Sequence, residues 1–141
     1  MIICEADKSG EVITVSYSQR VSVEDMRRYS EKVRELLPRI KPGFLLFSDL
    51  TSLESMDPDC APELGALMEL FCESGMATVV RVIPDPYKEI GINLISRFHL
   101  QSQVKVQTHE SLAEAIKSLL CERPEVFAQP MVGTTTDASS T

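Results

Sequence analysis

Apolar and polar residues follow two different spacings along this chain. Residues 11–17 alternate with a period of two, and together with residues 2–6 they predict a hairpin of two strands. Residues 44–49 and 77–83 are almost entirely apolar, which is typical of strands at the centre of a sheet. A further short strand is predicted at residues 103–107.

Apolar residues spaced three or four apart predict helices in the segments between and after these strands. Two of the helices begin with a capping box, Ser22 with Asp25 and Ser111 with Glu114. We expect the apolar stripes to form the protein core, because each would otherwise expose a continuous hydrophobic face. The stripes lie within residues 26–40, 64–71, 90–98 and 112–120.

The order of the predicted elements is β-β-α-β-α-β-α-β-α. Alternation of this kind favours an α/β domain, with a mixed sheet of about five strands covered by about four helices. We expect residues 1–121 to form this one domain. Residues 122–141 lose the periodic pattern and end in small polar side chains, so we expect them to be a disordered tail.

Composition and charge narrow the classes of partner. The formal net charge is −7, which disfavours nucleic acid and anionic membrane surfaces as ligands. No apolar run approaches the ~20 residues that a membrane-spanning helix needs. The first residues lack the basic and apolar regions of a secretory signal, so we expect a cytoplasmic protein with reduced thiols.

The segment from Phe44 to Cys60 carries the most functional information. Its apolar strand ends in Asp49, a Ser/Thr-rich loop is predicted at Thr51–Met56, and a helix is predicted to begin near Asp57. This order places polar groups at the carboxyl edge of a parallel sheet, where open α/β folds build their sites. One of the two aspartates of this helix start, Asp57 or Asp59, is expected to cap the helix.

The same segment resembles the signature of the anti-sigma-factor antagonist (STAS) domain. In that family an apolar strand is followed by Asp-Leu-Ser/Thr and then by Met/Ile-Asp-Ser-Ser-Gly-Leu at a helix start. The residues that match are Asp49-Leu50-Thr51, Leu53 and Met56-Asp57. The resemblance implies a STAS-like fold and a non-enzymatic module without a cofactor. Its implied partner is a kinase-like anti-sigma factor or a related signalling protein.

The resemblance also implies where that partner binds and how binding is regulated. In the family, the second serine of the signature is phosphorylated, but Asp59 stands at that position here and Cys60 replaces the glycine. Asp59 therefore carries a fixed charge at a helix N-terminus, which either keeps the module released or suits a partner that prefers an acidic helix end. The implied partner-binding residues are Thr51, Ser52, Ser55, Met56, Asp57, Pro58, Asp59, Cys60 and Glu63.

A second hypothesis is a carrier or sensor of a small apolar, lipid-like ligand. It follows from the SEC14-like branch of the same superfamily, and it would use the predicted helix at residues 86–99 as a mobile wall. The apolar residues of that helix are Ile90, Leu94, Ile95 and Phe98. A packed core and the wall of a pocket have the same sequence pattern, so periodicity does not separate the two hypotheses.

Metal and nucleophile chemistry are weaker alternatives. The acidic residues Glu54, Asp57, Asp59 and Glu63 match no calcium-loop spacing, and the cysteines match no zinc spacing. Cys60 as a nucleophile would need His99 or His109 as its base, and the neighbouring carboxylates oppose thiolate formation. We therefore expect neither an enzyme nor a metal site, and an edge strand would permit a homodimer.

Overall fold

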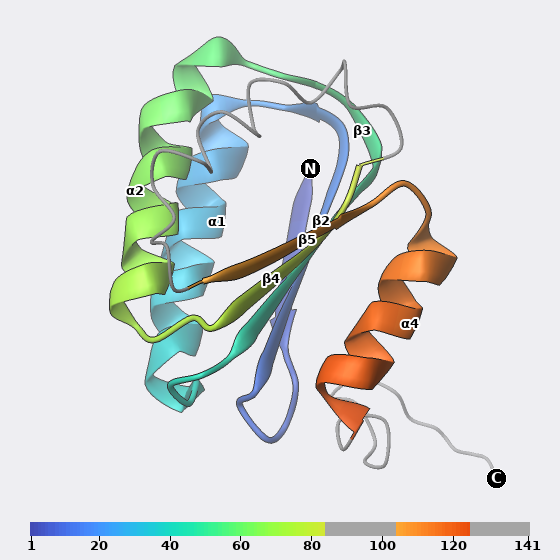
Figure 1. Ribbon diagram of the computed structural model, residues 1–141. Coiled ribbons are helices and arrows are strands. Elements are labelled where there is room, and N and C mark those ends of the chain that lie inside the picture. Colours follow the sequence, from blue (N-terminus) through green and yellow to red (C-terminus); the bar gives the residue numbers. More distant parts are fainter. Residues whose placement is uncertain (84–103, 125–141) are drawn as a thin grey trace, which may run out of the picture.

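The sheet has five strands in the spatial order β1-β2-β3-β4-β5, as the computed structural model shows for residues 1–83 and 104–124, the part of the chain that it describes (Figure 1). Strand β1 pairs with β2 in antiparallel orientation, and every later neighbour is parallel. The mixed sheet was therefore predicted correctly. The strands are β1 (Ile2–Ala6), β2 (Val12–Val21), β3 (Leu45–Met56), β4 (Thr78–Val82) and β5 (Lys105–His109).

Three α-helices fall within the described residues, against about four predicted. Helices α1 (Val23–Leu36) and α2 (Ala61–Glu73) cover one face of the sheet, and α4 (Leu112–Glu122) covers the other (Figure 1). The 3₁₀ turn η1 (Leu37–Arg39) follows α1, and η2 (Pro58–Cys60) precedes α2. The helix predicted at residues 86–99, like most of the predicted tail, lies outside the described residues.

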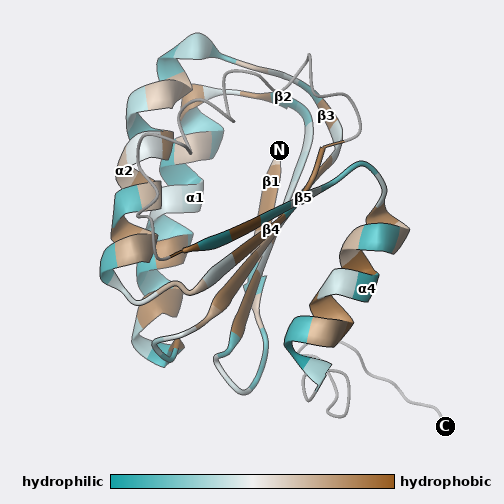
Figure 2. Ribbon diagram, viewed as in Figure 1, coloured by the Kyte–Doolittle hydropathy of each residue, from teal (hydrophilic) through white to brown (hydrophobic). Residues whose placement is uncertain are grey.

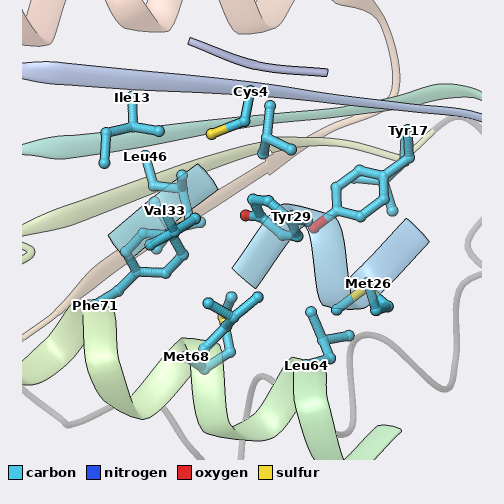
Figure 3. Packing of buried hydrophobic residues seen from close by; sticks show 14 of the residues in the cluster. Cys4, Ile13, Tyr17, Met26, Tyr29, Val33, Leu46, Leu64, Met68 and Phe71 are labelled. Atoms are coloured by element: carbon cyan, nitrogen blue, oxygen red, sulfur yellow. The ribbon is translucent and has the colours of Figure 1, made fainter. Parts of the chain in front are cut away.

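The larger core fills the space between the sheet and helices α1 and α2 (Figure 3). It forms because β2, β3 and β4 turn alternate apolar side chains to this face, where they meet the stripes of both helices. Two aromatic pairs pack edge to face with ring centroids 6.0 Å apart, Tyr17 on Tyr29 and Phe44 on Phe71. Figure 2 shows the apolar strands enclosed between the helical layers.

The smaller core lies under α4. It consists of Val12, Leu45, Phe47, Val80, Val82, Ala115 and Leu119. The stripe predicted for this helix is wrong in part, because Leu112, Ile116 and Leu120 remain about two-fifths exposed. The helix is rotated so that Ala115 and Leu119 are buried against the sheet.

Strands β2 and β3 are longer than predicted. The loop predicted at Thr51–Met56 is instead the end of β3, and it pairs with the last residues of β2 from Ser18 to Val21. Two register irregularities interrupt this pairing, and Gln19 adopts a left-handed backbone with φ 58°. Serine and threonine are common in loops, but here they occupy the exposed positions of a strand while Leu53 is buried.

The helix starts follow local sequence rules. Ser22 and Asp25 form the predicted capping box, with the Ser22 hydroxyl accepting from the Asp25 amide and the Asp25 carboxylate accepting from the Ser22 amide. The Ser111 hydroxyl accepts a hydrogen bond from the Glu114 amide at the start of α4. Strand β5 begins two residues later than predicted, because short polar strands carry weak periodicity.

Candidate functional site

The candidate site lies at the carboxyl edge of the sheet, where β3 ends and α2 begins. Parallel strands bring the starts of α1 and α2 to this same edge (Figure 1). The Asp57 amide donates to the Val21 carbonyl at 3.0 Å, and this bond ties the start of η2 to the end of β2. The consecutive residues predicted from the STAS signature therefore lie next to the beginning of α1.

The two aspartates of the signature have different roles. The Asp57 carboxylate accepts a hydrogen bond from the Asp59 amide at 2.9 Å and caps η2, as expected for one of the pair. The Asp59 carboxylate is exposed, and no described residue forms a hydrogen bond or ion pair with it. Asp57 therefore supports the local fold, while the charge of Asp59 is available to a binding partner.

The end of β3 presents hydroxyl groups to solvent. Thr51, Ser52 and Ser55 are all exposed, and Met56 is half-buried. Asp49 accepts hydrogen bonds from both the amide and the hydroxyl of Thr51, at 3.0 Å and 2.6 Å. Asp49 thereby orders the backbone at the point where the pairing of β3 with β4 ends.

Glu63 and Cys60 attach the candidate site to the elements packed beneath it. The Ser30 hydroxyl, buried on α1, donates to the Glu63 carboxylate in the first turn of α2. Cys60 is fully buried, and its thiol lies 3.9 Å from the Val21 carbonyl. Burial, reinforced by Asp57 and other nearby carboxylates, raises the pKa of the Cys60 thiol, so this cysteine is protonated and shielded rather than nucleophilic.

The first turn of α1 adds charge that sequence reasoning did not assign to the site. Hydrogen bonds from the Ser22 backbone and hydroxyl hold the pKa of Asp25 below its ordinary value. A hydrogen bond from Arg27 and the charges of Arg27 and Arg28 lower the pKa of Glu24. The signal for this neighbourhood was the Ser22–Asp25 capping box, because helices that follow parallel strands start at the same edge.

A small cavity lies among the described residues on the α2 side of the sheet. Its volume is about 20 Å³, and its walls include Tyr17, Ser48, Met68 and Arg81. That volume has room for about one water molecule, whereas ligand pockets usually measure about 300–1,000 Å³. The apolar-carrier hypothesis places its mobile wall at residues 86–99, outside the described residues, so it stays a prediction.

The described residues contain neither a cluster of metal ligands nor a helix that could cross a membrane. His, Cys, Asp and Glu side chains in residues 1–83 and 104–124 form no group of three that could hold a metal ion. In the same ranges, each helix is too short or too polar to cross a bilayer.

Sequence comparison gives no relative for this chain, whereas structural comparison finds proteins with the same fold. No protein-family model matches the sequence, and no curated protein matches it. An uncharacterized protein with a SpoIIAA-like fold from Shewanella loihica PV-4 superposes with a TM-score of 0.62 at 15% identity, covering 84% of this chain and 93% of that one.

Two anti-sigma factor antagonists have the same arrangement. SpoIIAA in its unphosphorylated form gives a TM-score of 0.57 at 12% identity, covering 86% of this chain and 98% of that one. An anti-sigma factor antagonist from Mycobacterium paratuberculosis gives 0.54 at 16% identity, covering 84% and 93%. At these identities the likeness defines the fold, and it agrees with the resemblance read from residues 49–57. The chain therefore has the SpoIIAA-like fold.

Proposed function

We propose that this chain is a non-enzymatic regulatory module that binds a partner protein through the end of β3, η2 and the first turn of α2. The observation that carries the proposal is the division of work between Asp57 and Asp59. Asp57 caps η2, and the exposed Asp59 carboxylate has no partner among the described residues. An exposed charge without a structural role is available for recognition, and anti-sigma factor antagonists are among the proteins with this fold.

The charge at residue 59 determines how the module is regulated. Asp59 has no hydroxyl, so a serine/threonine kinase cannot modify it. A charge at this helix start is also compatible with the fold, because free backbone N–H groups and the helix dipole favour an anion there. We infer that the module binds its partner without a phosphorylation step at residue 59.

The complementary chemistry of the partner follows from the same surface. Glu54 and Asp59 are exposed, and Asp57 and Glu63 are half-buried beside them. Such a surface favours a partner that presents lysine or arginine, with attraction that weakens as salt screens it. A kinase-like anti-sigma factor, or a related signalling protein with a basic docking face, is the proposed partner.

The test is capture of partners from lysate followed by affinity measurement with the purified partner. Asp59→Asn removes the charge and keeps the shape, and Glu114→Gln removes one charge from the exposed surface of α4 as a matched control. We expect Asp59→Asn to weaken binding about 5- to 30-fold and the control to leave it unchanged. If both variants bind equally well, or if a defined lipid is captured without a protein, the proposed function is wrong.

A further inference from the structure

Helix α4 carries an apolar stripe that the described residues leave uncovered. Leu112, Ile116 and Leu120 are 42%, 39% and 40% exposed. They are spaced four residues apart, so they lie along one side of the helix. Single exposed aliphatic side chains are ordinary on protein surfaces. Three in a row along one helix form an apolar patch, and its burial by another segment or molecule is favourable.

The stripe lies on the side of α4 that is turned away from β5. On the opposite side, the Ser118 hydroxyl donates to the Gln107 side chain, and the Lys105 ammonium pairs with Glu122 at 2.6 Å. These contacts fix the rotation of α4 about its axis, so the stripe cannot turn inward without breaking them. Its cover must therefore come from outside the described core.

The size of the stripe argues against a second copy of the chain. Standard protein interfaces involve roughly 20–30 residues on each side, whereas the stripe offers three side chains that are already more than half buried. A segment of the same chain needs far less surface, because the tether holds it at high effective concentration.

The chain that follows α4 has suitable chemistry and begins at the right place. Arg123 ends the helix, and its guanidinium donates to the Gly43 carbonyl, which fixes the point where the chain leaves the helix close to Leu120. Pro124 then prevents continuation of the helix. The sequence beyond it contains apolar residues before a polar end, namely Val126, Phe127, Met131 and Val132.

We propose that the segment from Val126 to Val132 packs along the apolar stripe of α4. The stripe from Leu112 to Leu120 is about 12 Å long at the rise of an α-helix. Seven extended residues span up to roughly 23 Å, which is enough to run back along it. The predicted disorder is then confined to the polar residues 133–141. This surface lies on the opposite face of the sheet from α2, so the inference is independent of the proposed function.

Hydrogen exchange of the full chain, followed by mass spectrometry, tests the proposal. In the wild type we expect the amides of residues 126–132 to exchange about tenfold more slowly than those of residues 133–141. Phe127→Ser should bring both segments to the same fast rate, and Thr135→Ser serves as a control in the polar end. Because Phe127 lies outside the described core, its substitution tests the contact separately from the fold.

A substitution on the stripe itself and a measurement of oligomeric state distinguish cover by residues 126–132 from cover by a second copy of the chain. Ile116→Ser should release residues 126–132 while exchange in β3 and β4 stays unchanged. Fast exchange of residues 126–132 in the wild type would overturn the proposal. It would also be overturned by a dimer in sedimentation velocity whose protection of α4 depends on concentration and is lost in Ile116→Ser, because the cover would then be a second copy.

Discussion

The two faces of the sheet are built very differently. On one face, α1 and α2 together bury a large cluster that includes two aromatic pairs, and the candidate site lies at the carboxyl edge of this face. On the other face, α4 is the one described helix, and it covers five buried sheet residues while leaving an apolar stripe exposed. The proposed binding surface therefore lies on the half of the molecule with the larger buried core. Rigid support of this kind helps a surface to keep its shape.

The largest expected effect is loss of packing on the α2 face. Phe71 is fully buried and packs against Phe44, so Phe71→Ala should lower the free energy of unfolding by about 3–5 kcal/mol. Urea unfolding followed by circular dichroism measures the change, with the exposed Ala66→Ser on the same helix as control. If Phe71→Ala lowered the free energy of unfolding no more than truncation of the core under α4, the two faces would not differ in packing as described.

Truncation under α4 should have a smaller effect. Leu119 belongs to the smaller core, and Leu119→Ala should cost about 2–3 kcal/mol, at the lower end for a buried leucine. The exposed Lys117 on the same helix provides the control, since Lys117→Ala should stay within about 0.5 kcal/mol of the wild type. If Leu119→Ala and Lys117→Ala changed the free energy of unfolding in urea equally, the packing of α4 against the sheet would not contribute to stability.

Alkaline pH should weaken the α1/α2 face through Cys4. Burial raises the pKa of this thiol from 9.0 to about 12, so the native state keeps a proton that the unfolded chain releases. The free energy of unfolding should therefore fall as pH rises from about 9 toward 12, by up to about 1.4 kcal/mol per pH unit.

Cys4→Ala should remove that part of the pH dependence, and Cys121→Ala, on the exposed surface of α4, should leave it in place. The measurement is urea unfolding at several values between pH 8 and pH 10. A slope that is the same in both variants would mean that the buried thiol does not couple to stability.

The smallest expected effect separates the two aspartates of the site. Asp57→Ala removes the cap of η2 and should cost about 1 kcal/mol of stability. Asp59→Ala should change stability by less than about 0.5 kcal/mol, because its carboxylate has no partner among the described residues. For binding of the proposed partner we expect Asp59→Ala to have the larger effect. A reversed order of stabilities in thermal unfolding would contradict the assignment of the cap.

Local rules predicted the elements of this fold well but not their full extent. The hairpin, the Ser22–Asp25 capping box and the order of the elements within the described residues depend on residues close in sequence, and the structure confirms them. The end of β3 was missed, because pairing with β2 overrides the loop preference of Thr51 and Ser52. For the site, the sequence identified the acidic helix start. Which of Asp57 and Asp59 caps the helix became clear only from the three-dimensional structure.

The α/β class, the order of the described elements and the position of an acidic turn after β3 could all be predicted from local sequence patterns. These features arise from periodicity, capping and turn chemistry, which act over a few residues. Only the tertiary structure decided that Cys60 is buried, that Glu63 is held by Ser30, and that α4 turns Ala115 rather than Ile116 toward the sheet. The physical reason is that burial and helix rotation depend on contacts between segments far apart in the chain, which no local pattern records.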